Sequence, residues 1–428
     1  MRILFIADGR SPIALNWIEY FVQEGHEVHL ASTYPCAPNI GLESLIVIPI
    51  TIGLTAGGLK ENASNDFPEQ TPVPVLGEEI KQKRRAEENE LLSFSLPAAS
   101  KKSLLRDIMP VGLRTAIRQR LMPGTLPSAS RKLKALIASI QPDLIHAMRI
   151  PYEGMLAALA DPPCPLVISV WGNDFTLHAP TTRALANLTR QTLQRANALH
   201  TDCERDRKLA FAWGYAHQKP TITLPGAGGV KLDVFNTKLV EKSRRETQPL
   251  IINPRGVRAY VRNDLFFHAI PQILAQMPEV RFICPGMAGE SQILDWVEKL
   301  DISRAVTLLP RLNRADMATL FNQAVVSVSL TEHDGTPNTL LEAMACGCFP
   351  VAGDIETLRE WITPGINGLL VPPDDSQAVA NAVLSVLSLP ELRQRAYDIN
   401  ISIIKEQADY TKIMPKALSF YRSLISSI

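Results

Sequence analysis

The chain has 428 residues, a formal net charge of +1, 46% hydrophobic residues and 20% charged residues. This length favours two domains of about 200 residues each, and the composition is that of a globular protein. The balanced charge excludes a general attraction to nucleic acid or acidic partners. No apolar run in the sequence approaches the roughly 20 residues that a membrane-spanning helix needs.

The first nine residues, MRILFIADG, lack the apolar core and the cleavage site of a signal peptide, so we expect a cytoplasmic protein. Six cysteines are spread along the chain, and only Cys346 and Cys348 lie close together. No histidine or cysteine follows this pair at the spacing of a zinc site. We therefore expect small packing cysteines and no bound metal.

The chain opens with a strand, a helix and a second strand. RILFIA is an apolar run of strand length, IALNWIEYFVQEG has apolar residues at helical spacing up to Gly25, and HEVHLAS is the second strand. Further strands are expected at LIVIPI, DLIHA, PLVISV and TITLPG, with helical stretches between the later ones. We therefore predict one α/β domain over residues 1–236.

Two segments of this domain depart from the alternation. Residues 53–100 are rich in Pro, Glu, Ser, Asn and Gly, a composition typical of a disordered surface excursion. Residues 101–140 contain nine Lys or Arg and one acid, Asp107, which gives a local charge of +8. This basic segment also has an apolar stripe, interrupted at Pro110. It suits an anionic membrane surface, and it equally suits a solvated face over a packed helix.

The alternation restarts in residues 249–408. Expected strands are LIINP, VRFICPG, AVTLLP, VVSVSL and FPVAG, separated by helical patterns such as NDLFFHAIPQILAQM, SQILDWVEKL and NRADMATLFNQA. Near-continuous apolar strands between helices imply a parallel sheet covered on both faces. The fold class is therefore α/β, with two doubly wound parallel-sheet domains facing a cleft. Ligands of such sheets bind beyond the carboxyl ends of the strands, where TEHDGTPN follows VVSVSL.

The stretch HDGTPNTLLEAMACG predicts an anion site at a helix N-terminus. Thr336 suits an N-cap and Pro337 suits the first helical position. The amides of Asn338, Thr339 and Leu340 would then be unpaired at the positive end of the helix, where phosphate is the usual occupant.

Glu342 is a carboxylate within an apolar helix, and it lies on the same face as Asn338. Burying such a charge is costly unless a polar group meets it. A phosphate seat beside Glu342 and Asp334 suits a phosphorylated sugar, because carboxylates accept hydrogen bonds from vicinal hydroxyls. A capped helix whose glutamate pairs with an arginine from elsewhere is equally compatible with this stretch.

Asp334 followed eight positions later by Glu342 resembles the E-x7-E motif of the family-4 retaining glycosyltransferases. INGLLVPPDDSQAVANAV, GGVKLDVF, MRILFIADG and PDLIHAMRIPYEG are also similar to segments of these enzymes, and the resemblance spans the chain except for about residues 53–130. It implies a GT-B fold, in which two Rossmann-like domains close on a nucleotide-sugar. It also implies a final helix, here within residues 409–428, that crosses back from the donor domain to the N-terminal acceptor domain.

The resemblance implies roles for Arg255, Asp334 and Glu342 in catalysis. The family holds the donor diphosphate with an Arg and a nearby Lys; Arg255 stands at the first place, but Tyr260 replaces the Lys. Arg258 and Arg262 are the nearby substitutes, and a solvated basic loop is the alternative interpretation. The predicted donor-binding residues are Arg258, Arg262, Gly335, Thr336, Asn338, Thr339 and Leu340.

The N-terminal domain offers weaker candidates. Many relatives have His-Gly where this chain has Trp171-Gly172, and that His contacts the transferred sugar. The first strand is followed by no G-x-G-x-x-G and the second by no acid, which speaks against an NAD site. For His146 a hydrogen-bonded structural role is the favoured alternative. The candidates for the N-domain side of the cleft are Gly9, Ser11, His146, Trp171 and Asp174.

The resulting hypothesis is a glycosyltransferase that moves a hexose from a nucleotide-diphosphate sugar to a saccharide or lipid-linked acceptor, with retention. Surface polysaccharide or glycolipid synthesis is the expected context. The donor is a co-substrate, and no cofactor, metal or nucleic acid is expected. Residues 101–140 suggest peripheral association with the inner face of the plasma membrane. The alternatives are a GT-B sugar-nucleotide epimerase and a non-catalytic nucleotide-sugar-binding protein.

Overall fold

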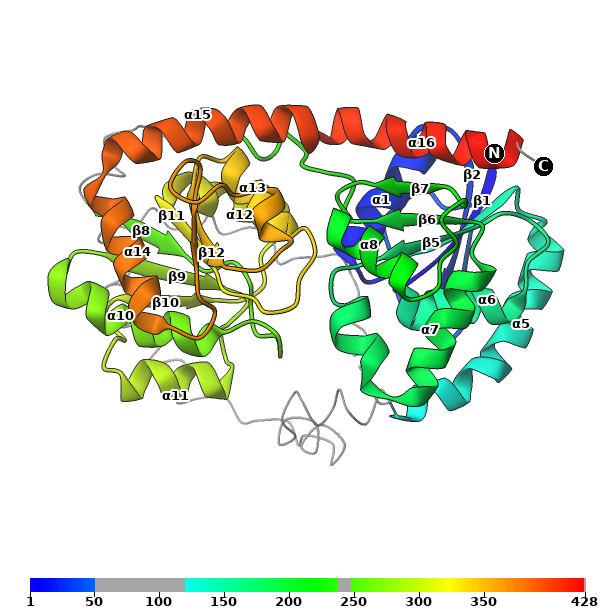
Figure 1. The fold of residues 1–428 in the computed structure, drawn as a ribbon, viewed down its shortest axis with the longest axis horizontal. Helices are drawn as coiled ribbons and strands as arrows, with labels where there is room; N and C mark the ends of the chain where they lie inside the picture. The colour runs from blue at the N-terminus through cyan, green and yellow to red at the C-terminus, as the bar shows by residue number, and fades with distance from the viewer. Residues whose placement is uncertain (51–119, 238–247, 427–428) are drawn as a thin grey trace, which may run out of the picture.

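A computed structural model describes residues 1–50, 120–237 and 248–426. It contains a seven-stranded sheet of order β3-β2-β1-β4-β5-β6-β7 and a six-stranded sheet of order β10-β9-β8-β11-β12-β13. All the strand pairs in both sheets are parallel. Each sheet forms its own lobe (Figure 1). The prediction of two parallel-sheet α/β domains is confirmed. The predicted excursion at residues 53–100 lies outside the described residues.

The N-terminal domain begins as the sequence predicts. Its strands are β1 (Arg2–Ala7), β2 (Glu27–Ser32), β3 (Ser44–Val47), β4 (Leu144–Ala147), β5 (Leu166–Val170), β6 (Ala198–Thr201) and β7 (Thr221–Thr223). Its helices are α1 (Pro12–Gln23), α5 (Leu126–Ile140), α6 (Met155–Ala160), α7 (Arg183–Arg195) and α8 (Glu204–Ala212). Short 3₁₀ or π turns cover Met122–Thr125, Ile150–Gly154, Asp174–His178 and Ala179–Thr181.

Alternation along β1 explains how this sheet is covered on both faces. Leu4 and Ile6 pack in one core with residues of α5, α6 and α7, whereas Ile3 and Phe5 pack in a second core with residues of α1 and the C-terminal helix. All four side chains are fully buried. Successive strand residues face opposite sides, so an uninterrupted apolar strand needs a layer on each.

The C-terminal domain has the same layered architecture. Its strands are β8 (Leu250–Ile252), β9 (Arg281–Pro285), β10 (Val306–Leu309), β11 (Val326–Ser329), β12 (Phe349–Gly353) and β13 (Leu369–Val371). Its helices are α10 (Asn263–Gln276), α11 (Ser291–Lys299), α12 (Arg314–Gln323), α13 (Asn338–Ala345), α14 (Ser376–Ser388) and α15 (Pro390–Gln407), with a 3₁₀ turn at Leu358–Glu360. Residues of α10 and α14 share one core, and residues of α12 and α13 share the other.

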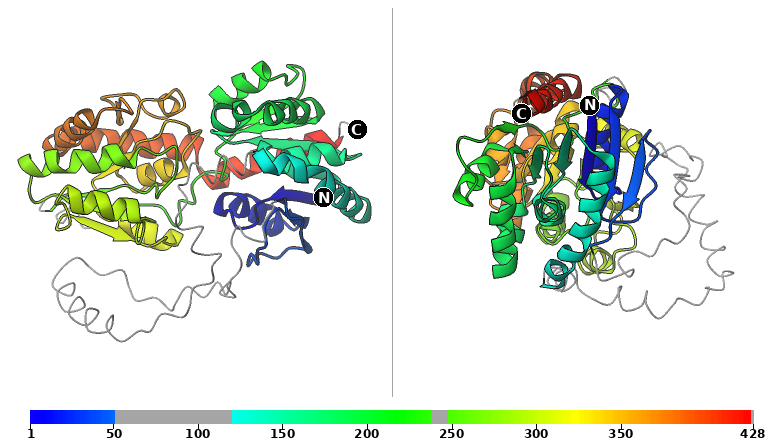
Figure 2. Two further views of the ribbon diagram at one scale, coloured as in Figure 1. Left: turned by 90° about the horizontal axis from the view of Figure 1, so that it is seen from below. Right: turned by 90° about the vertical axis from the view of Figure 1, so that its right-hand side faces the viewer.

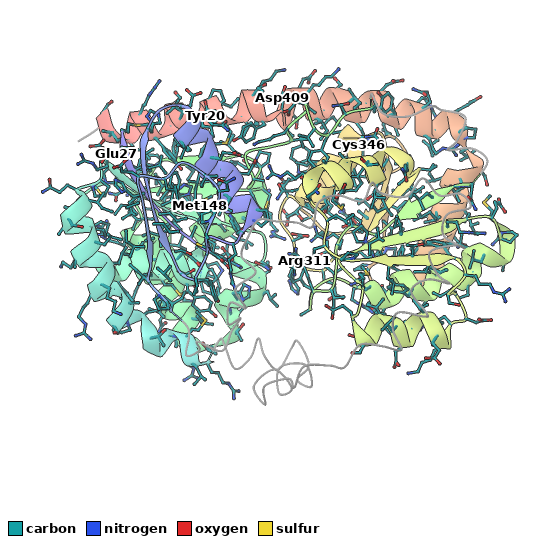
Figure 3. The ribbon with its side chains drawn as sticks, turned by 180° about the vertical axis from the view of Figure 1, so that it is seen from behind. Tyr20, Glu27, Met148, Arg311, Cys346 and Asp409 are labelled. Atoms are coloured by element: carbon teal, nitrogen blue, oxygen red, sulfur yellow. The ribbon has the colours of Figure 1, made fainter. Side chains whose placement is uncertain are left out.

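The last helix, α16 (Tyr410–Ser426), packs on the N-terminal domain. Helix α15 runs along the C-terminal lobe and α16 continues along the N-terminal lobe (Figures 1 and 2). Asp409 marks the junction between these two helices (Figure 3). There, Val230 bridges to Asp409, so the chain crosses between the domains twice at one place. On the N-terminal domain, Tyr421 stacks on Phe21 with ring centroids 4.7 Å apart.

The described part of the basic segment, residues 120–140, contains α5. Its apolar side packs in the core through Leu133 and Ile137, while Arg131, Lys132 and Lys134 are exposed. Residues 101–119 lie outside the described part of the chain. No helix among the described residues is long and apolar enough to span a bilayer.

Candidate functional site

The loop after β11 and the first turn of α13 form the centre of the predicted site. The helix begins at Asn338, one residue later than expected, and Pro337 has the extended backbone of an N-cap. The prediction that Thr336 caps the helix and that Pro337 occupies its first position is therefore wrong. The Thr336 hydroxyl instead donates to the Asp202 carbonyl in the other domain at 2.6 Å and accepts from Trp361 Nε1 at 3.1 Å.

Two of the three predicted amides remain available at this helix end. The Leu340 N–H donates to the Pro337 carbonyl at 3.0 Å, so the prediction that it is unpaired is wrong. Within the described parts of the chain, the amides of Asn338 and Thr339 have no acceptor. Unpaired amides at the positive end of a helix dipole attract an anion.

Glu342 is partly buried on α13, and no Lys, Arg or His of the described residues lies within ion-pairing distance of it. Burial raises the pKa of Glu342 to about 7, and the more distant charge of Arg314 only partly offsets this effect. The Arg314 guanidinium is itself bonded to Asn16 Oδ1 of the N-terminal domain at 2.7 Å. The carboxyl group therefore has no ion-pair partner among the described residues, and the cost of its burial is offset only in part.

Arg255 and Asp334, both predicted site residues, form an ion pair. Arg255 follows β8, is 9% exposed and also donates to Thr339 Oγ1 at 3.2 Å. Its Nε atom is buried and has no acceptor among the described residues. The Gly335 amide donates to Asp334 Oδ1 at 3.2 Å. The guanidinium, the carboxylate and the start of α13 therefore form one polar cluster.

The two substitute arginines differ in their partners. Arg258 is exposed and donates to the Tyr260 hydroxyl at 3.0 Å. Arg262 donates to Asp264 at 2.7 Å, to Glu332 at 3.0 Å and to the Pro373 carbonyl at 3.0 Å. These contacts hold the loop after β8 against its own domain, and they are not shared with Arg255.

The domains touch beside this cluster. Gly172 packs so closely on Gly335 that a Cβ atom at position 172 would overlap the Gly335 backbone. Glu360 of the C-terminal domain accepts from the Glu204 amide at 3.0 Å and the Arg205 amide at 3.2 Å, at the first turn of α8. Residues from both domains therefore border the Asp334 loop.

Asp202, which follows β6, was not predicted and lies at this contact. It is 8% exposed and borders Gly335, and its Oδ1 atom has no partner in the described parts of the chain. Burial, together with the nearby carboxylates of Asp206 and Asp334, raises the pKa of Asp202 well above its usual range. Because the sequence analysis missed β6, it also missed the residue at its end.

Asp202, Cys203 and Asp206 have ligand atoms close enough to hold a metal ion. Arg205, however, pairs with Asp206 at 2.7 Å. A guanidinium within the group already supplies the positive charge that a cation would bring. This arrangement fits a protein ion pair better than a metal centre.

Three candidates of the N-terminal domain have structural contacts. His146 is fully buried and bonded to the Tyr421 hydroxyl and to Ser169 Oγ, so it does not line the cleft, and the structural role that was the favoured alternative is correct. Ser11 caps α1 by accepting from the Ala14 amide at 3.4 Å. The Gly9 amide donates to Ser32 Oγ at 3.1 Å, in the turn after β1.

Trp171 and Asp174, both predicted, converge on Arg149, which the sequence analysis missed. Asp174 is 1% exposed and accepts from Arg149 at 3.0 Å, from the Trp171 amide at 3.0 Å and from the Ile150 amide at 3.2 Å. Burial raises the pKa of Asp174, and Arg149 opposes that rise. Asp174 thus positions Arg149 and does not itself reach the surface.

Comparison with known families identifies the class of protein. The description "Glycosyl transferase 4-like domain" matches residues 9–226, and "Glycosyl transferases group 1" matches residues 235–401. Together they cover both lobes, including the Arg255, Asp334 and Glu342 cluster. The chain belongs to the glycosyltransferase 4-like family, and it is a glycosyltransferase with a GT-B fold.

Particular relatives support this assignment. Over 308 residues the chain is 25% identical to a phosphatidyl-myo-inositol mannosyltransferase of Mycolicibacterium smegmatis. The aligned region covers 70% of this chain and 75% of the relative. Sucrose-phosphate synthase of Thermosynechococcus elongatus has the same fold, with a TM-score of 0.71, 15% identity and full coverage of both chains. Anabaena HepE, solved with UDP, has a TM-score of 0.67, 15% identity and coverage of 99% and 100%.

Proposed function

We propose that this glycosyltransferase moves a hexose from a nucleotide-diphosphate sugar to an acceptor, with retention at the anomeric carbon. The observation that supports it best is that α13 carries two unpaired amides at its first turn and, one turn further on, the carboxyl of Glu342, which has no ion-pair partner among the described residues. The amides suit a phosphate, and the carboxyl suits the neighbouring ribose diol. The solved complexes of HepE with UDP and with UDP-glucose, and the name of the mannosyltransferase relative, support the same chemistry.

The cluster suggests a role for each residue. Arg255 and Arg258, with the Asn338 and Thr339 amides, stabilise the diphosphate as negative charge develops on it during departure. Glu342 holds the ribose, and Asp334 orients the hexose through its hydroxyls. Arg262 keeps the loop after β8 in place through its own ion pairs. Positive charge for the leaving group thus comes from guanidiniums and a helix end, so we propose that no metal or other cofactor is needed.

Nucleotide-sugar binding and turnover separate this function from its rivals. A thermal-shift panel of uridine, guanosine and adenosine diphosphate sugars identifies the donor base, because the ribose and diphosphate contacts stabilise the folded state. Slow hydrolysis of the stabilising donor supports a transferase. Conversion to an epimeric sugar without acceptor supports the epimerase, and binding with no turnover supports a non-catalytic protein.

We also propose that the acceptor is a saccharide or a lipid-linked molecule at a membrane surface. The exposed face of α5 presents Arg131, Lys132 and Lys134. Clustered cations on a helix attract anionic lipid headgroups. Sedimentation with vesicles containing anionic lipid tests this point, and absence from the pellet at low and high salt would contradict it.

A further inference from the structure

The first turn of α8, in the N-terminal domain, is capped by a side chain of the C-terminal domain. The N-cap residue of this helix, Cys203, makes no side-chain capping bond. The amides of Glu204 and Arg205 donate instead to the two carboxylate oxygens of Glu360, at 3.0 and 3.2 Å. A carboxylate at the positive end of a helix dipole satisfies amides that the helix itself leaves unpaired. Glu360 therefore joins the two domains through the backbone of α8.

Glu360 stands on a rigid part of its own domain. It ends the 3₁₀ turn Leu358–Glu360, and both Leu358 and Ile362 are buried in the core that contains residues of α12 and α13. The side chain of Glu360 is itself exposed. Because water competes for an exposed carboxylate, its bonds to α8 can break and re-form at little cost. The position of Glu360 is thus fixed, while its contact with the other domain is reversible.

The residues on either side of this turn hold the Asp334 loop. Thr357 Oγ1 donates to the Asp334 carbonyl at 3.0 Å, and Trp361 Nε1 donates to the Thr336 hydroxyl at 3.1 Å. The Thr336 hydroxyl in turn donates at 2.6 Å to the carbonyl of Asp202, the residue before the N-cap of α8. Hydrogen bonds therefore form a closed circuit from α8 through the 3₁₀ turn and the Asp334 loop back to the start of α8.

One buried group opposes this domain contact. Asp202 is 8% exposed, its carboxyl group borders Gly335, and its Oδ1 atom has no partner among the described residues. Burying an unpaired carboxyl group is costly. Separation of the domains would return this group to water and would break the bonds of Thr336 and Glu360. The contact thus combines favourable and unfavourable contributions, so the loss of one hydrogen-bonding side chain can shift the equilibrium between joined and separated domains.

We propose that Glu360 is a positioning residue that latches the two domains together and thereby holds the Asp334 loop in place for turnover. While Glu360 caps α8, the Thr336 hydroxyl stays bonded to the Asp202 carbonyl. When the latch opens, the Asp334 loop loses its support from the N-terminal domain. The effect of this latch on turnover rests on the proposed function, whereas its effect on the separation of the domains does not.

The test compares Glu360→Gln and Glu360→Ala with the wild type. The glutamine keeps one acceptor oxygen for the two amides of α8, and the alanine keeps none. We expect donor hydrolysis to fall severalfold in Glu360→Gln and tenfold or more in Glu360→Ala. The affinity for UDP or GDP should stay within about twofold in calorimetry, because the amides of α13 and Glu342 lie within the C-terminal domain. Small-angle X-ray scattering without donor should give Glu360→Ala a larger radius of gyration than the wild type.

Glu356→Ala is the matched control. Glu356 also faces α8, where it lies 3.8 Å from Lys208, but both side chains are exposed and such a pair contributes little. This variant should have the turnover and the radius of gyration of the wild type.

An unchanged radius of gyration in Glu360→Ala would overturn the latch, and wild-type turnover at a larger radius would overturn its positioning role. A loss of nucleotide affinity as large as the loss of turnover would also overturn that role, because it would trace the effect to the donor seat. Wild-type protein that binds no nucleotide would contradict the proposed function. In that case a larger radius in Glu360→Ala, with no change in Glu356→Ala, would still support the latch.

Discussion

Arg255 and Asp334 lie 79 residues apart in the sequence and form an ion pair at the carboxyl edge of the C-terminal sheet. The pair joins a residue that suits the donor diphosphate to one that suits the donor sugar. The Asp334 carboxylate therefore weakens the attraction between Arg255 and a diphosphate, because it neutralises part of the positive charge of the guanidinium.

Asp334→Asn should separate the two contributions. Removing the carboxylate leaves Arg255 with its full charge, so the affinity for UDP or GDP should stay the same or rise severalfold. The affinity for the intact nucleotide-sugar relative to that nucleotide, and donor turnover, should both fall by tenfold or more. The reason is that the hydroxyls of the donor sugar lose the charged carboxylate that accepts their hydrogen bonds. Calorimetry and a hydrolysis assay measure these changes.

The control is Asp264→Asn, which alters a carboxylate bonded to Arg262 instead of Arg255. Equal effects of the two substitutions would contradict a specific role for Asp334. A drop in nucleotide affinity as large as the drop in nucleotide-sugar affinity would show that Asp334 supports the loop and does not contact the sugar.

Glu342 should lower the unfolding free energy of the protein without donor at neutral and higher pH, although it serves donor binding. Burial places its folded-state pKa at about 7, against an ordinary value of 4.5. Between these pH values the unfolded chain has lost the proton and the folded chain has kept it, so stability falls as pH rises. Glu342→Gln removes this penalty, and we expect about 1 to 2 kcal/mol of added stability at pH 8 and little change at pH 4. Denaturant unfolding at the two pH values measures it.

The same Glu342→Gln protein should lose most of the thermal shift that the donor produces. Glu332→Gln is the matched control, because Glu332 lies in the neighbouring loop and pairs with Arg262 at 3.0 Å. Similar loss of the donor-induced shift in both variants would refute the assignment of Glu342 to the ribose. If Glu342→Gln gains no more stability over the wild type at pH 8 than at pH 4, the conclusion that burial raises the pKa of Glu342 is contradicted.

Tyr421 should anchor α16 to the N-terminal domain. Its hydroxyl accepts from Trp17 Nε1 at 3.0 Å and bonds to His146, deep in the core. Tyr421→Phe leaves both groups without a partner, at about 1 to 3 kcal/mol for each. We expect a loss of about 2 kcal/mol or more in unfolding free energy, with unchanged affinity for UDP or GDP.

Tyr20→Phe provides the comparison, since the Tyr20 hydroxyl has no hydrogen-bond partner among the described residues while its ring packs on Phe21 and Tyr410. It should change the unfolding free energy by a few tenths of a kcal/mol. Tyr421→Phe that unfolds like Tyr20→Phe would show that the buried hydroxyl adds no stability.

The sequence predicted the fold where local pattern and tertiary environment agree. Strands such as β1 are apolar throughout because both faces are covered, and α1 begins at a serine cap and is followed by Gly25 with φ +75°. Strand β6 was missed because its four residues include His200, whose ring bonds to Ser169 and to the Leu224 carbonyl. Its polarity is satisfied only by distant parts of the chain. Strand β13 was also missed, although β7 and β8, which are equally short, were predicted.

The site was predictable to the extent that one loop carries it. Asp334 and Glu342 lie in one continuous stretch, whereas Arg149 depends on Asp174, which follows a different strand. The error at Thr336 has a similar cause. A threonine before a proline suits an N-cap, but the hydroxyl donates to the carbonyl of Asp202 in the other domain, and no local pattern encodes that contact.

The contact between Gly172 and Gly335 should be needed for turnover and not for nucleotide binding. A Cβ atom at position 172 would overlap the Gly335 backbone, which lies beside Asp334 and cannot move aside like a flexible side chain. Gly172→Ala should therefore push the domains apart and misplace the N-terminal domain relative to the donor. A displacement of about 1 Å can reduce turnover about 100-fold. Since the amides of α13 and the carboxyl of Glu342 lie within the C-terminal domain, affinity for UDP or GDP should stay within about twofold.

Gly124→Ala is the control, because nothing lies within 4 Å of a Cβ atom there. Full turnover by Gly172→Ala would mean that the enzyme works with its domains further apart than this structure shows, and parallel losses of turnover and nucleotide affinity would mean that the substitution disturbs the donor seat itself.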